Sequence, residues 1–229
     1  MPRRCGVPLR MTSLGTIGSG NIGSTVARLA VAAGHDVVLS NSRGPDTLRE
    51  LAAEIGARAG TTADAAAADV VLVTVPLEVY PDLDPELLAG KVVLDTMNYY
   101  PQRDGQIAEL DDKRSTTSGL LQAHAPQAKV VKAFNNIYFK HLLNLARPEG
   151  DPERSPLLIA GDDESAKALA GSFIGSLGYD VLDTGSLAES WRFERDRPAY
   201  AAAYGTFENE AGAPITAERL QELLDEAVR

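Results

Sequence analysis

Short apolar runs alternate with segments of helical periodicity along most of this chain. The runs occupy residues 13–17, 36–39, 70–75, 91–95, 129–134, 157–160 and 179–182. The run at 70–75 shows no regular alternation with polar residues, which is typical of a parallel strand buried on both faces. Between the runs, apolar residues recur at helical spacing, as at Ile22, Val26 and Leu29. The alternation predicts an α/β fold with a doubly wound, mostly parallel sheet.

A glycine-rich sequence follows the first apolar run: Gly18-Ser19-Gly20-Asn21-Ile22-Gly23. Between a strand and a helix, Gly18 permits a tight turn, Gly20 lets a pyrophosphate approach the backbone, and Gly23 lets the helix pack closely on the sheet. The first N–H groups of the helix would then face the phosphates. A tight turn without a ligand is the alternative. The strand before the motif and the helix after it favour a dinucleotide site in a Rossmann-type fold.

The end of the second apolar run predicts which dinucleotide binds. An NAD-preferring site usually has an acidic residue there, about 20 residues after the glycines, to bind the ribose hydroxyls. This chain has no acid at that point, and its residues are Ser40, Asn41, Ser42 and Arg43. An Arg fork and hydroxyl donors can bind a 2′-phosphate, which a carboxylate would repel. We therefore expect NADP(H), with Arg43 on the phosphate and Asn41 or Ser42 assisting, the alternative being that Arg43 is a solvated loop charge.

The carboxyl ends of later strands supply further candidates, because ligands of such sheets lie beyond those ends. The candidate walls for the nicotinamide–ribose half of the site are Val75, Pro76 and Leu77. Asn98 follows the fourth run and could reach the cofactor or a substrate. Asn135 and Asn136 follow the fifth run, and their amides suit hydrogen bonding to a carboxamide. Ordinary turn chemistry would explain the two adjacent asparagines equally well.

The net charge, the lengths of the apolar runs and the cysteine count exclude several classes of function. The formal net charge of −10 argues against nonspecific binding to nucleic acid and against an anionic membrane surface. No run approaches the ~18 apolar residues of a membrane span. Cys5 is the only cysteine, so an internal disulfide is impossible and we expect a cytoplasmic protein. We expect no metal site, because the acidic cluster at 162–164 fits helix-start electrostatics and the histidines have no partner ligands nearby.

We divide the chain into three parts. Residues 1–12 are basic but lack an apolar core, so we expect a flexible N-terminal extension and not a signal peptide. Residues 13–195 form the predicted NADP-binding domain. Residues 196–229 form a short C-terminal extension that ends in a helix, and that helix could contribute a contact to a homodimer.

Several of these motifs together resemble one known family. They are residues 18–23, Ser42-Arg43, Val75-Pro76, residues 130–135, Gly161-Asp162-Asp163 and Gly185-Ser186-Leu187. The set is similar to the NADPH-dependent reductases of the deazaflavin coenzyme F-420. It also resembles the cytosolic oxidoreductase domain of the six-transmembrane metalloreductases. The resemblance covers roughly residues 13–191 and, relative to that pattern, Asn41 is one extra residue at the strand tip.

The resemblance implies hydride transfer between NADPH and a flavin-like ring stacked against the nicotinamide. The cofactor-binding residues that it implies are Gly18, Ser19, Gly20, Asn21 and Ile22, then Ser42 and Arg43, then Val75, Pro76, Leu77, Ala133, Phe134 and Asn135. Transfer between two stacked rings depends on distance and orientation more than on an acid or base. We therefore assign no catalytic residue, and we interpret Lys132, Tyr99 and Trp191 as structural.

Three functions remain open at this stage. The first is an NADPH-dependent oxidoreductase whose partner is a small-molecule redox acceptor, a deazaflavin or a flavin. The second is an NADP-dependent reductase of another small substrate, bound near Asn98 and Asn135. The third is a nonenzymatic NADP(H)-sensing module that binds a protein partner. An open face above the nicotinamide favours the first, a closed pocket with a positioned acid favours the second, and a filled face with an exposed apolar patch favours the third.

Overall fold

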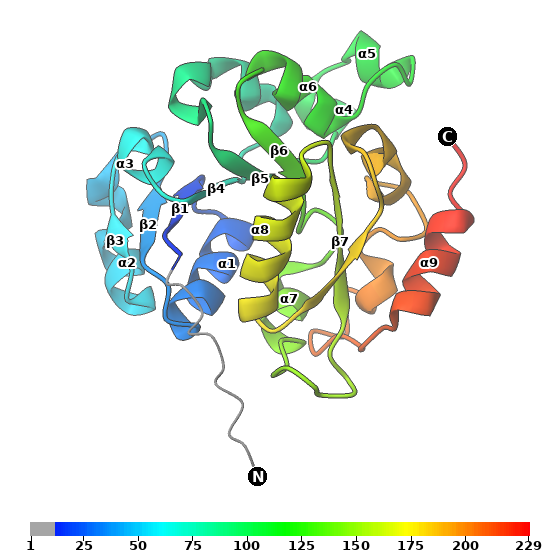
Figure 1. Cartoon of the computed structure of the whole chain (residues 1–229). Helices are drawn as coiled ribbons and strands as arrows, with labels where there is room; N and C mark the ends of the chain where they lie inside the picture. The colour runs from blue at the N-terminus through cyan, green and yellow to red at the C-terminus, as the bar shows by residue number, and fades with distance from the viewer. Residues whose placement is uncertain (1–11) are drawn as a thin grey trace.

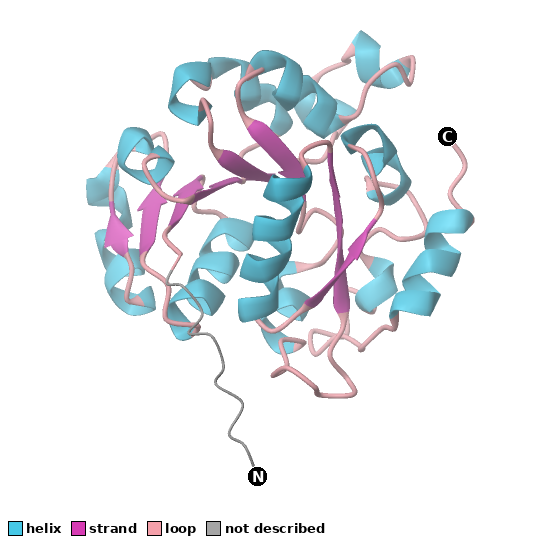
Figure 2. Cartoon of the chain, viewed as in Figure 1, coloured by secondary structure: helices cyan, strands magenta, loops and turns pink. Residues whose placement is uncertain are grey.

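The computed structural model describes residues 12–229, so Cys5 and nearly all of the expected N-terminal extension lie outside the described residues. Within that range the chain forms an eight-stranded sheet in the order β3-β2-β1-β4-β5-β6-β7-β8 (Figures 1 and 2). The strands are β1 Leu14–Ile17, β2 Val37–Ser40, β3 Arg58–Ala59, β4 Val70–Val73, β5 Val92–Asp95, β6 Lys129–Lys132, β7 Pro156–Gly161 and β8 Asp180–Asp183. The predicted Rossmann-type, mostly parallel sheet is confirmed.

Strand register brings the glycine turn and two other strand ends to one edge of the sheet. β1 lies between β2 and β4, and all three run parallel. Ile17 pairs with Ser40 on one side and with Val73 on the other, so the three strands end together. The chain crosses here from one half of the sheet to the other. Such a crossing point opens a crevice at the carboxyl ends of the strands, where ligands of these folds bind.

The last two strands reverse direction. β7 pairs antiparallel with β6 through Val131 and Gly161, and β8 then runs parallel to β7. An antiparallel addition at the edge of a parallel sheet is common in α/β proteins. The loop that follows β6 therefore reaches the same edge as the glycine turn, whereas β7 leaves from it.

Helices cover both faces of the sheet, as Figure 2 shows. Alternate residues of β4 explain why: Val70 and Leu72 point into one hydrophobic cluster, and Val71 and Val73 point into the other. The α-helices are α1 Asn21–Ala32, α2 Arg49–Ile55, α3 Thr62–Ala66, α4 Pro101–Asp104, α5 Ala108–Asp111, α6 Thr117–His124, α7 Phe139–Asn144, α8 Glu164–Ser176 and α9 Ala217–Asp225. The first cluster includes residues of α1, α2, α7, α8 and α9, and the second includes residues of α3 and α6.

The structure differs from the sequence prediction in some short elements. β3 is only two residues long, and α4 and α7 are too short to produce a clear helical period. The helix expected from Pro45 starts as a 3-10 turn, Pro45–Leu48, before α2. The strand expected to reach residue 134 ends at Lys132, and Phe134 has a φ of +59°, which extended backbone does not allow.

The C-terminal segment packs into the same core as the rest of the chain. Tyr204 and Leu220 are fully buried, and Leu223 and Leu224 are nearly so. In Figure 1, α9 is coloured red and lies at the β7 end of the sheet. The apolar face of this helix, which we expected to be available for a dimer contact, is therefore already covered within the chain. No helix of residues 12–229 is long and apolar enough to cross a membrane.

Candidate functional site

The three glycines of the turn after β1 meet different surroundings. Gly18 has a φ of +102°, and a Cβ there would lie 2.3 Å from the carbonyl oxygen of Thr74. A Cβ at Gly23 would lie 2.4 Å from the carbonyl oxygen of Gly18. Gly20 is different, because its φ of −78° suits any residue and a Cβ there would meet no protein atom within 4 Å. The protein itself therefore requires Gly18 and Gly23, whereas Gly20 borders open space that a ligand could occupy.

Hydrogen bonds hold the glycine turn against the end of β2. The backbone N–H of Gly18 and the hydroxyl of Ser19 both donate to the carbonyl of Ser40, at 3.1 and 2.9 Å. The hydroxyl of Ser40 is buried and donates to the carbonyl of Thr16 at 2.7 Å. Ser40 is thus part of the scaffold, which leaves Asn41, Ser42 and Arg43 as the residues at the tip of β2.

The tip of β2 exposes one unpaired guanidinium. The Asn41 side chain shapes the loop itself, because its Oδ1 accepts from the N–H of Arg43 at 3.0 Å and its Nδ2 donates to Thr47 Oγ1 at 3.0 Å. Ser42 and Arg43 are exposed. The Arg43 guanidinium makes no hydrogen bond or ion pair with any part of the chain from residue 12 onward. Its charge is therefore available to an anion.

A cavity of about 460 Å³ opens at the carboxyl ends of β1, β4, β5 and β6. Eight of the residues proposed from sequence line it: Gly20, Asn21, Ile22, Val75, Pro76, Asn98, Phe134 and Asn135. Leu77 and Ala133 do not, because both side chains are fully buried in the hydrophobic clusters beneath. Their side chains therefore form part of the core beneath the cavity and not its wall. Gly18, Ser19 and the tip of β2 lie outside the lining of this cavity.

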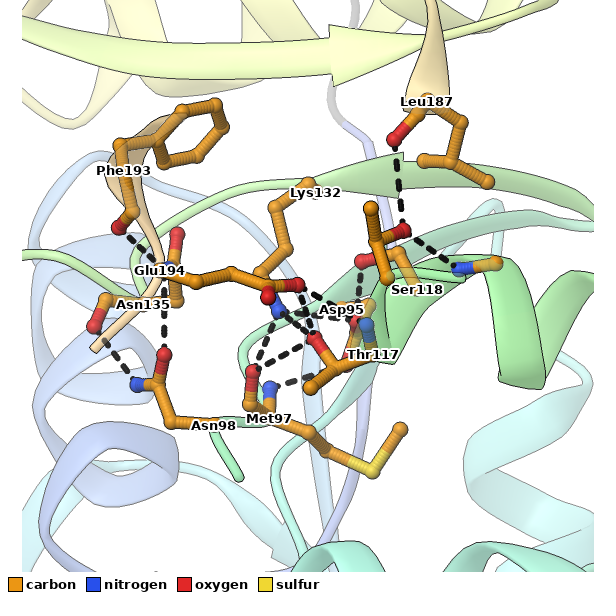
Figure 3. A network of polar contacts seen from close by, with 12 residues as sticks. Asp95, Met97, Asn98, Thr117, Ser118, Lys132, Asn135, Leu187, Phe193 and Glu194 are labelled. Carbon is orange, nitrogen blue, oxygen red and sulfur yellow. Dashed lines mark hydrogen bonds and ion pairs between the residues drawn. The ribbon is translucent and has the colours of Figure 1, made fainter. Parts of the chain in front are cut away.

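Two amide side chains join the loops that follow β5 and β6. Asn98 Nδ2 donates to the carbonyl of Asn135 at 2.8 Å, and Asn135 Nδ2 donates to Asn98 Oδ1 at 3.3 Å and to the carbonyl of Phe193 at 3.0 Å (Figure 3). These contacts determine the orientation of the Asn135 amide. Asn135 Oδ1 is then a buried acceptor that has no partner among the residues described. An unpaired buried acceptor costs about 1–3 kcal/mol, so a ligand N–H at this point would be bound favourably.

Asn136 has a different function from its neighbour. Its Nδ2 donates to the carbonyl of Ala199 at 3.1 Å, and its own carbonyl accepts from the N–H of Ala201 at 2.9 Å. It does not line the cavity. Of the two adjacent amides only Asn135 can contact a ligand there, and Asn136 holds the C-terminal segment in place.

A buried polar network lies beneath these loops (Figure 3). Lys132 Nζ lies 3.2 Å from Asp95 Oδ2 and donates to Thr117 Oγ1 at 2.7 Å and to the carbonyl of Met97. Thr117 Oγ1 donates in turn to a carboxylate oxygen of Glu194 at 2.7 Å. Lys132 is fully buried and does not line the cavity, so its interpretation as a structural residue holds. The sequence signals for the network were Asp95 at the end of one apolar run and Lys132 within another.

Tyr99 and Trp191 lie in a second, smaller hollow of about 300 Å³. The hydroxyl of Tyr99 donates to Asp111 Oδ1 at 2.9 Å, and the guanidinium of Arg197 lies 5.4 Å from the centre of the Trp191 ring system. Neither aromatic residue lines the larger cavity. Within residues 12–229 no group of three or more potential metal ligands occurs together.

The aromatic wall of the larger cavity was missed from sequence. Its members are Tyr100, Tyr138, Phe139, Tyr200 and Phe207. Tyr200 and Phe207 come from the C-terminal segment, which we had separated from the nucleotide-binding part. No local pattern marks Tyr200 and Phe207, because only the packing of the C-terminal segment against the loop after β6 brings these two residues to the site.

Comparison with known proteins identifies the chain. Residues 13–99 match the family model described as NADP oxidoreductase, coenzyme F-420-dependent. The solved structure of a hypothetical protein from Sinorhizobium meliloti is 31% identical, with a TM-score of 0.73 over 83% of this chain and 94% of that one. A protein from Arthrobacter sp. FB24 assigned as an F-420-dependent NADP reductase is 25% identical, with a TM-score of 0.67 over 78% and 87% of the two chains. This chain is therefore similar to that family, by sequence over residues 13–99 and by fold over most of its length.

The chain is also similar to part of a longer metalloreductase. Metalloreductase STEAP3 of Rattus norvegicus is 28% identical over 190 residues, which are 82% of this chain and 37% of that protein. The chain therefore spans well under half the length of this relative. The resemblance found in the sequence is confirmed: the chain has a Rossmann-type fold and is similar to NADP-dependent oxidoreductases.

Proposed function

We propose that this protein transfers a hydride from NADPH to a deazaflavin or flavin-type acceptor, and that both molecules meet in the cavity described above. The observation that carries the proposal is the cavity itself, which continues from the open approach at Gly20, past Asn98 and Asn135, to the aromatic wall. Its volume of about 460 Å³ lies within the range typical of small-molecule sites. The acceptor half of the proposal also draws on the family description.

The glycine turn would hold the pyrophosphate. α1 begins at Asn21, and the first N–H groups of a helix of this length have no partner within the helix. They favour an anion, as does the positive end of the helix dipole. Gly20 has the open approach that a phosphate against the backbone requires. Ser19 is already bonded to Ser40, so we assign it to the shape of the turn.

The tip of β2 would select NADP(H) over NAD(H). Arg43 offers an exposed, unpaired guanidinium, and Ser42 offers a hydroxyl beside it. Both groups can bind a phosphate dianion, and a guanidinium fork matches it well. Asn41 would contribute indirectly, because its amide holds the N–H of Arg43 and so shapes the loop.

The amide of Asn135 would orient the nicotinamide. Its Oδ1 can accept a hydrogen bond from the carboxamide N–H₂, which would satisfy the buried acceptor. Asn98 holds the amide from one side, and Val75 and Pro76 would flank the ring. When NADPH is bound it supplies the hydride, and the residues around it supply position and exclude water.

The aromatic wall suits a planar acceptor. Tyr138 lies edge-on to Phe207 and to Phe139, with ring centroids 5.2 and 4.7 Å apart. The Phe207 side chain is 59% exposed, whereas most phenylalanine side chains are buried. A flat heteroaromatic ring stacked here would bury that surface. This argument favours a ring-shaped acceptor over a small aliphatic substrate.

The test is NADPH oxidation by the purified protein, with coenzyme F-420, FMN, FAD and ferric chelates offered separately and with NADH in parallel. Fast turnover with coenzyme F-420 alone would support the deazaflavin. Turnover with FMN or FAD would support a flavin acceptor. Tight NADPH binding without turnover on any of these acceptors would overturn the proposed acceptor and favour another small substrate or an NADP(H)-sensing module.

A further inference from the structure

Two tyrosine hydroxyls meet at the edge of the cavity. The hydroxyl oxygens of Tyr100 and Tyr200 lie 2.7 Å apart, and both residues line the cavity. Tyr100 precedes α4 in the loop after β5, and Tyr200 is one hundred positions further along the chain. No other hydroxyl pair of this kind lies in the lining of the cavity within residues 12–229.

A strained turn presents Tyr200 to the cavity. Ala201 has a φ of +41° and a ψ of −60°, and the N–H of Ala202 donates to the carbonyl of Tyr200 at 2.5 Å. This is a γ-turn of the rare, strained kind. Asn136 secures it on both sides, through Ala199 and Ala201. Strain that the surroundings hold in place often marks a functional position.

Two arginine side chains lie over the ring of Tyr100. The guanidinium carbons of Arg103 and Arg195 lie 4.8 and 4.7 Å from the centre of its ring. Asp104 balances Arg103, at 2.7 Å, and accepts from the backbone N–H of Tyr100. Asp196 lies 3.3 Å from Arg195. Each guanidinium therefore pairs with a carboxylate and also lies over the Tyr100 ring.

The two hydroxyls have different roles in the pair. Burial raises the pKa of Tyr200, and the hydrogen bond with Tyr100 raises it further. Tyr200 therefore keeps its proton. Either hydroxyl can donate in this pair, and when Tyr200 donates, the proton of Tyr100 is free to point toward a molecule in the cavity.

We propose that Tyr100 is the proton donor for the acceptor that takes the hydride, and that Tyr200 positions it. This inference rests on the proposed function.

The acceptor receives the hydride of NADPH, with its two electrons, at one atom, and the displaced electron pair moves to an oxygen or nitrogen. That atom takes the proton as the O–H bond of Tyr100 breaks. The phenolate is held by the Tyr200 hydroxyl and the two guanidinium groups, and it regains a proton from water. The substrate class is therefore an acceptor that gains a proton with the hydride, such as a flavin-type ring, a quinone, a carbonyl or an imine.

Three variants test the proposal. Tyr100→Phe and Tyr200→Phe each remove one hydroxyl of the pair, and Tyr99→Phe is the matched control, because its hydroxyl faces Asp111 outside the cavity. With coenzyme F-420 and FMN as acceptors, Tyr100→Phe should lower kcat by about 10²- to 10⁴-fold. Tyr200→Phe should lower it by about 10- to 100-fold, as expected for one hydrogen bond to a developing charge. Fluorescence titration should give an NADPH dissociation constant within about threefold of wild type, since the proposed NADPH contacts involve neither hydroxyl, so the loss should fall on kcat.

Two further readouts separate proton donation from a structural role. Imidazolium buffer should accelerate Tyr100→Phe in proportion to its concentration and leave the wild type unchanged. In the protein without NADPH, N-acetylimidazole should acetylate Tyr100 faster than Tyr200, and the Tyr200→Phe change should slow the reaction. Failure of the wild type to bind NADPH would refute the proposed function alone. Wild-type turnover by Tyr100→Phe, or equal acetylation of the two tyrosines, would overturn the assignment of Tyr100.

Discussion

The carboxylate of Asp95 and the ammonium of Lys132 lie 3.2 Å apart, and both side chains are fully buried. The two residues are direct partners across β5 and β6. Each stands just before a loop that borders the cavity, one carrying Asn98 and the other Asn135. The ion pair therefore holds the two loops at one separation, on which the Asn98–Asn135 hydrogen bonds depend.

Removing the cation of this pair should destabilise the protein strongly. Lys132→Met would leave the buried charge of Asp95 without its counter-ion, held only by hydrogen bonds from Ser118 and the Met97 N–H, and such changes cost about 3–5 kcal/mol. Urea denaturation followed by circular dichroism measures the free energy of unfolding. The double variant Asp95→Asn, Lys132→Met should be more stable than Lys132→Met alone, because it removes the unpaired charge. A cost below about 1 kcal/mol for the single variant would show that water or a proton compensates Asp95 easily.

The glycine turn offers a matched pair of substitutions that separate folding from binding. Gly20→Ala should change the free energy of unfolding by less than about 1 kcal/mol, because its φ is ordinary and its Cβ would meet no protein atom. The added methyl group should still weaken NADPH binding by about tenfold or more, since it occupies the space where the backbone would meet the pyrophosphate. Isothermal titration calorimetry checks the affinity.

Gly18→Ala is the contrasting member of that pair. Its positive φ and the close Thr74 carbonyl should make it destabilising by roughly 1–3 kcal/mol or more, which thermal unfolding would detect. If Gly20→Ala bound NADPH as tightly as the wild type, the pyrophosphate would have to lie elsewhere.

Arg43→Ala should discriminate between the two dinucleotides. Loss of a charge-assisted contact worth about 1.5–3 kcal/mol should raise the Kd for NADPH by about 10- to 150-fold and leave that for NADH nearly unchanged. Arg49→Ala is the control, because that arginine is also exposed but pairs with Asp46 at 2.6 Å. Fluorescence titration with both dinucleotides gives the comparison, and equal losses for NADPH and NADH would remove Arg43 from the 2′-phosphate.

The start of α8 should make stability depend on acid pH. Hydrogen bonds from Ser165 and Ala166, together with the Lys129 ammonium, hold the pKa of Asp163 well below its ordinary value of 3.8. Because the pKa of Asp163 is lowered in the folded state, its ionised carboxylate contributes fully to the free energy of unfolding above the unfolded pKa, near pH 4. That contribution is lost as the pH falls below this value. The unfolding free energy of the wild type should therefore fall more steeply below about pH 4 than that of Asp163→Asn, which keeps an N-cap.

Urea denaturation at pH 6, 4 and 3 would measure that difference. Asp82→Asn is the control, because the Asp82 carboxylate is exposed and makes no hydrogen bond or ion pair within residues 12–229. Parallel pH dependence of the wild type and Asp163→Asn would mean that Asp163 does not retain these contacts in solution.

The sequence by itself determined the features that depend on local backbone preference and on burial along one element. Apolar runs and helical periods identified the sheet, because a strand or helix buries side chains at a spacing set by its own geometry. The glycine turn was partly local, since the positive φ of Gly18 and the contact between Gly23 and Gly18 lie within the turn, whereas the contact of Gly18 with Thr74 comes from the neighbouring strand end. The acid-free tip of β2 could be read in the same way, because every residue concerned lies within a few positions.

Only the tertiary structure decided which side chains face the cavity and which support it. Leu77 and Ala133 follow strands that do end at the site, yet they point into the core, and Asn136 turns to the C-terminal segment although Asn135 beside it faces the cavity. The pairing of Tyr100 with Tyr200 spans one hundred positions. Contacts between distant segments result from the packing of the whole chain, and no local spacing encodes them.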